Sequence, residues 1–155
     1  MDPSSRDAEA CWPSIRDWLE TWAGLVRAVD YAAARRLFCD DVVAFGTQTP
    51  VMRGLDELVE RQWKAIWPHS DGFHFELDHA AATVDASRRM ACVMSPWTST
   101  GYGERGEAFD RPGRATIVLT RDAVDQPWRA SHTHLSLRAD VPRTTRLDPP
   151  KPEAR

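Results

Sequence analysis

The spacing of the apolar residues changes near residue 70, and this change limits the folds open to the chain. Up to Pro68 the apolar side chains recur at the three- and four-residue spacing of an amphipathic helix. From Phe73 onward, as in "FHFELDH", they recur at every second position, which is the spacing of a half-buried strand. Helices followed by strands favour an α+β domain over an alternating βαβ arrangement. We therefore expect a curved antiparallel sheet wrapped around N-terminal helices.

Two helical segments carry continuous apolar stripes. In the first, "CWPSIRDWLETWAGLVRAVD", Pro13 suits the first turn, and the stripe consists of Ile15, Trp18, Leu19, Trp22, Leu25, Val26 and Val29. A short helix in "YAAARRLFC", with Asp30 as its expected cap, and a strand in "DDVVAFG" follow. The next helix, "LDELVERQWKAIW", should end at Pro68. Its apolar face consists of Leu55, Leu58, Val59, Gln62, Trp63, Ile66 and Trp67.

The last strands define the end of the folded domain. "RATIVLTRD" and "WRASHTHLSLR", joined by the turn "AVDQP", predict a β-hairpin. The residues after it, "VPRTTRLDPPKPEAR", are polar and rich in proline, and cannot bury a core. We expect a disordered or frayed N-terminus at 1–11, one domain at 12–138 and a Pro-rich flexible tail at 139–155.

Composition excludes several classes of protein. The net charge is about −3 and no basic stripe is present, which argues against a nucleic-acid partner. No apolar run approaches the roughly 20 residues of a membrane span, and "MDPSSRDAEA" lacks the apolar core of a signal peptide. We therefore expect a cytoplasmic protein without a membrane partner. Cys11, Cys39 and Cys92 lack CxxC spacing, which indicates small buried side chains rather than zinc ligands or disulfides.

Two histidines, separated by one threonine, stand in the last strand, within "WRASHTHLS". Residues two apart in a strand face the same side. The face that we expect to line a cavity consists of Trp128, Ala130, His132, His134 and Ser136, with Arg114 and Thr116 from the neighbouring strand. Three interpretations of the histidine pair stay open: structural residues bonded to the backbone, a pocket wall that orients a ligand or moves a proton, and metal ligands. No further spacing motif supplies the remaining ligands, so we predict no metal and no cofactor.

Cations and aromatic rings supply further candidate contacts. Arg114 could hold a carboxylate or enolate between its N–H donors, and with Thr116 could stabilise an oxyanion. Tryptophan is frequent for this length, at 7 residues, which fits either an aromatic core or a cavity with flat apolar walls. The candidate substrate contacts are Thr116, Trp63, Trp67, Trp97, Tyr102 in a Gly-rich loop, Arg53 and Thr47.

Three stretches together match a known pattern: "AARRLFCDDVVAFG", "VMRGLDELVERQW" and "GRATIVLTRD" with "WRASHTHLSL". On these residues the chain resembles the nuclear-transport-factor-2-like superfamily over positions 12–138, and most of all its SnoaL-like and ketosteroid-isomerase-related members. The resemblance implies a cone-shaped, cystatin-like α+β barrel with a pocket between the helices and the concave face of the sheet. It also implies a homodimer formed through the outer sheet face. It leaves the chemistry open, because one fold supports many functions.

One departure from the resemblance limits the chemistry. The general-base aspartate of such isomerases would fall near Phe45 or Gly46, and neither residue can take a proton. The tyrosine expected on the first helix has no counterpart, because Trp18 and Trp22 fill that region. Steroid isomerisation by that mechanism is therefore not expected.

Two functions remain open from the sequence. The first is binding of a small, partly apolar organic ligand in the barrel pocket, with proton-transfer chemistry of an isomerase, cyclase or dehydratase type at His132, His134 and Arg114. The second is a non-catalytic module that binds or assembles as a dimer.

Overall fold

The first helix is longer than its apolar stripe predicts. The computed structural model describes residues 3–155, and α1 (Pro3–Ala28) includes most of the segment expected to be frayed. The first two residues of that segment lie outside the described residues. Pro13 therefore lies inside the helix rather than in its first turn. The stripe itself is confirmed, with Leu25 half-buried and these residues buried: Ile15, Trp18, Leu19, Trp22, Val26 and Val29.

The remaining helices follow the predicted order. In α2 (Tyr31–Arg35) the Asp30 side chain accepts a hydrogen bond of 2.9 Å from Ala33 N, which confirms the predicted cap. The next helix consists of α3 (Leu55–Leu58), a π-helical turn η1 (Val59–Trp63), α4 (Lys64–Ile66) and a final 3₁₀ turn η2 (Trp67–His69). Its whole predicted face is buried. No helix among the described residues combines the length and the apolar composition that a membrane crossing requires.

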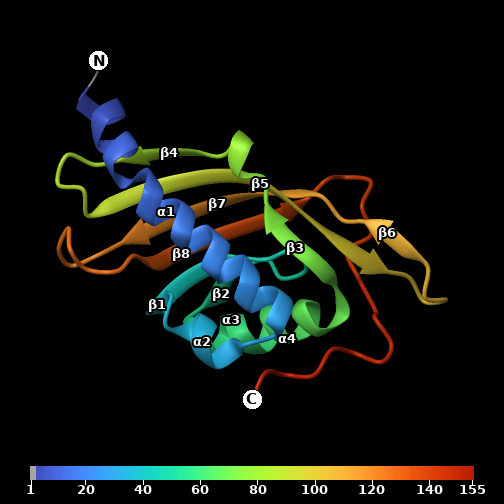
Figure 1. Ribbon diagram of the computed structural model, residues 1–155. Coiled ribbons are helices and arrows are strands. Elements are labelled where there is room, and N and C mark those ends of the chain that lie inside the picture. Colours follow the sequence, from blue (N-terminus) through green and yellow to red (C-terminus); the bar gives the residue numbers. More distant parts are fainter. Residues whose placement is uncertain (1–2) are drawn as a thin grey trace.

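The strands form one curved sheet around the helices, as expected. They are β1 (Phe38–Phe45), β2 (Met52–Arg53), β3 (Asp71–Phe75), β4 (Ala81–Val84), β5 (Met90–Tyr102), β6 (Ala108–Asp110), β7 (Gly113–Thr120) and β8 (Arg129–Leu137). A 3₁₀ turn, η3 (Leu77–His79), connects β3 to β4. The order is β2-β1-β8-β7-β5-β3, with β4 and β6 also paired to β5. Only β1 and β8 pair in parallel among these strands, and β7–β8 is the predicted hairpin. Figure 1 shows α1 crossing the sheet, which curves without closing.

The register separates the sheet into two chemically different faces. Residues paired directly across neighbouring strands point to the same side. One set of paired residues, here called the inner row, consists of Ala44, Thr133, Ile117, Val93 and Ala82. The adjacent set, here called the outer row, consists of Phe45, His134, Thr116, Met94 and Ala81. The inner row is buried apart from the half-buried Ala82, whereas Phe45 and Met94 are each 39% exposed. The inner row therefore faces the helices and the outer row faces away from them.

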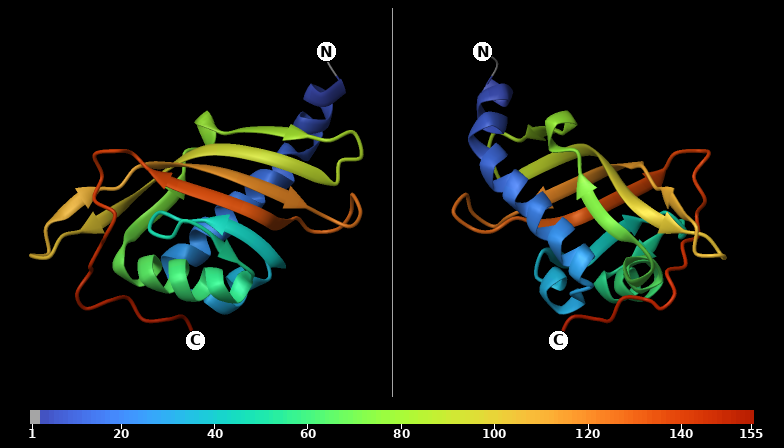
Figure 2. Two further views of the ribbon diagram at one scale, coloured as in Figure 1. Left: turned by 180° about the vertical axis from the view of Figure 1, so that it is seen from behind. Right: turned by 45° about the vertical axis from the view of Figure 1, so that its right-hand side comes forward.

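The Pro-rich segment 139–155, expected to form a flexible tail, lies along the domain and bonds to it. Figure 2 shows it leaving β8 and passing the helices to end near α2. Backbone hydrogen bonds join Arg146 N to Tyr102 O, Lys151 N to Pro68 O and Ala154 N to Val29 O. Thr145 is 4% exposed; its Oγ1 donates to His69 O at 2.6 Å and accepts from Tyr102 N at 2.8 Å. The tail thus connects segments that are distant in sequence.

Replacement of Thr145 by valine should lower the free energy of unfolding by about 1–3 kcal/mol, because it leaves the Tyr102 N–H without its partner. Thr144→Val is the matched control: its side chain is exposed, and the expected change is within about 0.5 kcal/mol. Urea denaturation of both variants measures the difference. Equal stability of the two would show that the tail is not held at Thr145.

Candidate ligand-binding cavity

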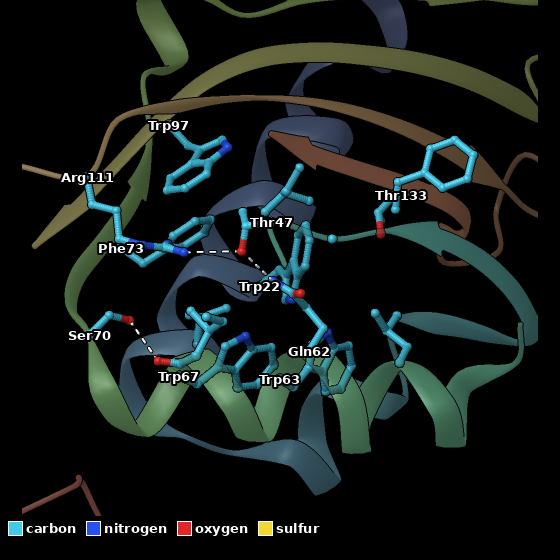
Figure 3. Close-up of a pocket in the computed structure, with 16 residues that line it drawn as sticks. Trp22, Thr47, Gln62, Trp63, Trp67, Ser70, Phe73, Trp97, Arg111 and Thr133 are labelled. Carbon is cyan, nitrogen blue, oxygen red and sulfur yellow. Dashed lines mark hydrogen bonds between the residues drawn. The ribbon is translucent and has the colours of Figure 1, made fainter. Parts of the chain in front are cut away.

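A cavity lies between the concave face of the sheet and the helices, and five aromatic rings from the helices, β3 and β5 line it (Figure 3). The rings are those of Trp22, Trp63, Trp67, Phe73 and Trp97. Trp63 and Trp67 stack with their centroids 4.5 Å apart, and the rings of Phe73 and Trp97 lie 5.4 Å apart. Flat rings of this kind hold an apolar surface open because they cannot collapse to fill an irregular space.

The same cavity is lined by polar side chains. They belong to Thr47, Gln62, Ser70, Arg111 and Thr133. The Ser70 hydroxyl donates to Ile66 O at 3.1 Å and is therefore satisfied. The space that the centre of a water molecule can occupy is about 40 Å³. A single water needs about 10–15 Å³ by this measure, so this conformation admits a molecule of only a few atoms. A larger ligand requires side chains to move.

The π-helical turn η1 carries Gln62 and Trp63, which both line the cavity. Such a turn inserts an extra residue into a helix, rotates the side chains around it, and is frequent at functional sites. Gln62 is 9% exposed, and its Nε2 donates to Thr47 Oγ1 at 3.0 Å. Its Oε1 is buried and has no partner among the described residues. A polar atom without a partner in an apolar wall is costly unless something binds it.

Because Gly46 has no side chain, the amide group of Gln62 can occupy the space beside it. A Cβ at Gly46 would overlap Gln62 Oε1, so any larger residue here would displace the amide. This is the region where the resemblance to isomerases places a general-base aspartate. In this chain the side chain of Phe45 lies in the outer row, and a neutral amide fills the position in front of Gly46.

Arg111 places a positive charge in the wall. It is 2% exposed, its Nη2 donates to Thr47 Oγ1 at 3.1 Å, and its guanidinium carbon lies 5.6 Å from the centroid of the Trp97 ring. Its Nε is buried without a partner, and no carboxylate oxygen of residues 3–155 lies within 4.0 Å of its guanidinium nitrogens. Burial lowers the pKa of Arg111 to about 10. The residue therefore remains a cation at neutral pH, without an anionic partner.

The backbone around Arg111 is fixed by the sheet. Arg111 N donates to Ser99 O at 2.9 Å, and Ser99 N donates to Arg111 O at 3.1 Å, which extends the β5–β6 pairing. Gly101 gives the side chain room, because a Cβ at that position would overlap the Phe109 ring and lie 3.2 Å from Arg111 Cδ. The guanidinium is thus directed by a strand end and not by a mobile loop.

The structure brings some of the sequence-predicted contacts into the cavity. Trp63, Trp67, Trp97 and Thr47 all line it. Arg53 and Tyr102 do not: Arg53 is exposed on β2, and the Tyr102 hydroxyl donates to Asp71 Oδ2 at 3.0 Å beside the tail. This hydrogen bond raises the pKa of Tyr102.

The expected orientation of the histidine face is wrong. His134, Thr116 and Arg114 line a groove on the outer side of the sheet together with Met94, and none of them lines the cavity. His132 contacts Val43 O through Nδ1 at 2.7 Å, and Phe45 packs against both histidines with ring centroids 5.3 and 5.2 Å away. These polar residues do share one face of the sheet, as expected, but that face is the outer one and not the cavity wall.

A β-bulge explains the error. Val118 pairs with His132 but Leu119 pairs with Ala130, so Ser131 is an extra residue in β8. An extra residue breaks the alternation of side chains along a strand. Trp128 and Ala130 are consequently buried, while the histidines that follow point outward. In addition, the buried face of a sheet is normally its apolar face, and here that face carries Ile117, Leu119 and Leu135.

Several cavity residues had no place among the sequence candidates: Trp22, Gln62, Phe73, Arg111 and Thr133. Gln62 offered a signal, since it is polar on an otherwise apolar helical face. Arg111, in "FDRPG", offered none, because an arginine beside a proline is ordinarily exposed. Within residues 3–155, no group of three or more His, Cys, Asp or Glu side chains is placed to hold a metal ion.

Solved structures with a similar fold include proteins named as members of the nuclear-transport-factor-2-like superfamily. A superfamily protein from Salmonella enterica aligns with a TM-score of 0.64 at 18% identity, over 89% of this chain and 95% of that chain. A ketosteroid isomerase-like protein from Erwinia carotovora gives 0.66 at 19% identity, over 84% and 96%. The association domain of CaMKII from C. elegans gives 0.64 at 15% identity, over 83% and 97%. At such identities the similarity shows the fold alone.

The family itself follows from the sequence. A model of the SnoaL-like domain matches residues 15–140, which is most of the chain. The chain belongs to the SnoaL-like domain family. No curated protein matches it.

Arg111→Met should leave the free energy of unfolding at pH 7 unchanged or higher. The lowered pKa of Arg111 corresponds to a cost on the order of 3 kcal/mol for burying its charge. The lost hydrogen bond and ring contact are worth about 1 kcal/mol each. Folded Arg111 releases its proton at a lower pH than the unfolded chain does, so the cost declines as the pH rises above about 10.

Urea denaturation at pH 7 measures this change, with the exposed Arg129→Met as the matched control. A loss of more than about 3 kcal/mol in Arg111→Met alone would show that the arginine supports the fold and is already compensated.

Proposed function

We propose that the chain binds a small, partly apolar organic molecule in the cavity between helices and sheet. The observation that carries the proposal is the combination of an aromatic wall with polar atoms that lack partners, Arg111 Nε and Gln62 Oε1. Ligand sites are typically apolar clefts with a few converging polar groups. The name of the ketosteroid isomerase-like neighbour agrees with small-molecule binding in this fold.

The cavity wall favours binding over acid–base catalysis by its own side chains. Among the described lining residues, Arg111 is the one with an ionisable side chain. With a pKa of about 10 it remains protonated at neutral pH and stabilises negative charge instead of exchanging a proton. The proton-transfer role considered for His132, His134 and Arg114 would therefore need a substrate on the outer face of the sheet.

A pair of substitutions on one strand tests where a ligand binds. Thr133→Phe places a ring inside the cavity, and His134→Phe places the same ring on the outer face of β8. Thermal shift and tryptophan fluorescence with a panel of small aromatic and aliphatic compounds give the readout. We expect at least a tenfold loss of affinity in Thr133→Phe and less than a threefold change in His134→Phe, because only the first fills the cavity.

The opposite result, with binding lost in His134→Phe and kept in Thr133→Phe, would locate the site on the outer face. It would then support the proton-transfer role considered for His132 and His134. A wild-type protein that binds no compound of the panel would contradict the proposed function.

A second candidate function, assembly of identical chains, rests on the outer face of the sheet. The outer row crosses β1, β8, β7, β5 and β4 without interruption, and Phe45 and Met94 within it are 39% exposed. Met90, which lies on β5, is 52% exposed. Exposed apolar side chains that gather on one face often mark a protein interface. The name of the CaMKII association domain, a structural neighbour, agrees with assembly in this fold.

If two chains associate through this face, Met94→Glu should place a charge in the interface and raise the dissociation constant at least tenfold. Val124→Glu is the matched control, since Val124 is also exposed, at 46%, but lies in the turn between β7 and β8. Sedimentation velocity over a range of concentrations measures both. Monomeric wild-type protein at the highest concentration would remove this candidate.

A further inference from the structure

Arg111 is a buried cation, and most of its N–H donors lack a hydrogen-bond acceptor. A guanidinium has five N–H donors. The described structure gives Arg111 a single hydrogen-bond acceptor, Thr47 Oγ1, and leaves Nε without a partner. The Trp97 face offers a weaker attraction, at 5.6 Å from the guanidinium carbon. Buried charges are ordinarily paired, and this one lines a cavity with no described carboxylate within 4.0 Å of it.

Thr47 adds a second donor at the same place. Its Oγ1 accepts from Arg111 Nη2 at 3.1 Å and from Gln62 Nε2 at 3.0 Å. A hydroxyl oxygen has two acceptor positions, so both are taken and the O–H remains free to donate. The described residues provide no acceptor for it. Guanidinium N–H groups and a hydroxyl thus converge on one part of the wall.

We propose that the ligand is a small monocarboxylate with an apolar body, and that its carboxylate pairs with Arg111 and accepts from Thr47. This inference rests on the proposed function and names the class of ligand for the same cavity. The aromatic rings of Trp63, Trp67 and Trp97 contact the apolar body. A planar carboxylate matches the donor fork of a guanidinium, and charge-assisted bonds of this kind are among the strongest in proteins.

The charge and the space both favour a carboxylate over a phosphate. A phosphate ester carries up to two negative charges, whereas Arg111 is the one cation among the described lining residues. The second charge would be buried without compensation. A phosphate group is also larger than a carboxylate, and the space that the centre of a water molecule can occupy in this cavity is only about 40 Å³. A neutral ligand, in turn, would leave the guanidinium charge unpaired.

Matched pairs of probes test the charge requirement on the wild-type full chain. Acetate, propionate and benzoate are titrated beside acetamide, propionamide and benzamide, which have nearly the same shape without the charge. Isothermal titration calorimetry gives the affinities, and the Arg111 Nε–H resonance of ¹⁵N-labelled protein reports on the guanidinium. We expect each bound carboxylate to bind at least tenfold more tightly than its amide, and to shift that resonance downfield.

Three variants complete the experiment. Arg111→Met should abolish the preference for the carboxylate, Arg111→Lys should keep part of it, and Arg129→Met, exposed at the start of β8, should keep all of it. Equal binding of carboxylate and amide by the wild type, or an undiminished preference in Arg111→Met, would overturn the inference. So would a wild type that binds none of the carboxylates. Neutral probes that bind and are blocked by Thr133→Phe would in that case leave the proposed function standing.

Discussion

The packing of rigid aromatic rings between a curved sheet and its helices is the constraint on which the rest of the structure depends. Trp22 contacts Phe38, Phe73 and Phe75 on the strands, and Phe38 in turn contacts Trp63 of η1. These contacts fix the distance between the two layers. Because a planar ring has few rotamers, the layers cannot close further without a steric clash. The cavity is a consequence of this separation, and its aromatic walls are the same residues that hold the fold together.

Within these apolar surroundings, the burial of Arg111 is not explained by a gain in the stability of the fold. Burying a guanidinium beside tryptophan rings costs free energy that a hydrophobic residue of similar size would not. The strand pairing at Ser99 nevertheless directs the side chain inward, and Gly101 leaves room for it. Residues that weaken a fold and are held in place by their surroundings are characteristic of functional sites. The same reasoning covers Gln62, which the π-helical turn places opposite Thr47 with one unpaired oxygen.

The fold was predictable from the sequence because it depends on patterns that extend over many residues. The helical stripes and the β7–β8 hairpin are such patterns, and a single irregular position does not obscure them. The site was less predictable because it depends on single positions. One inserted residue, Ser131, reverses the side to which His132 and His134 point, and no local signal distinguishes it. Arg111 is buried by the tertiary approach of β5, β1 and the helices, which periodicity does not describe. Trp63, Trp67 and Trp97 were predictable as cavity residues because they are large apolar side chains in segments whose pattern predicts a buried helix face or a strand.

The two faces of the sheet carry different kinds of side chain. The inner face is largely apolar and borders a cavity with one buried cation, Arg111, whereas the outer face carries histidines, exposed methionines and Phe45. Strand β8 links them, since Thr133 lines the cavity and the residues beside it, His132 and His134, lie outside. The proposed ligand binding inside and the proposed association outside can therefore be tested independently by substitutions one residue apart. If the two were energetically coupled, the coupling would have to pass through β8 and its neighbour β1, which contributes Phe45 to the outer row and leads directly to Thr47 in the cavity.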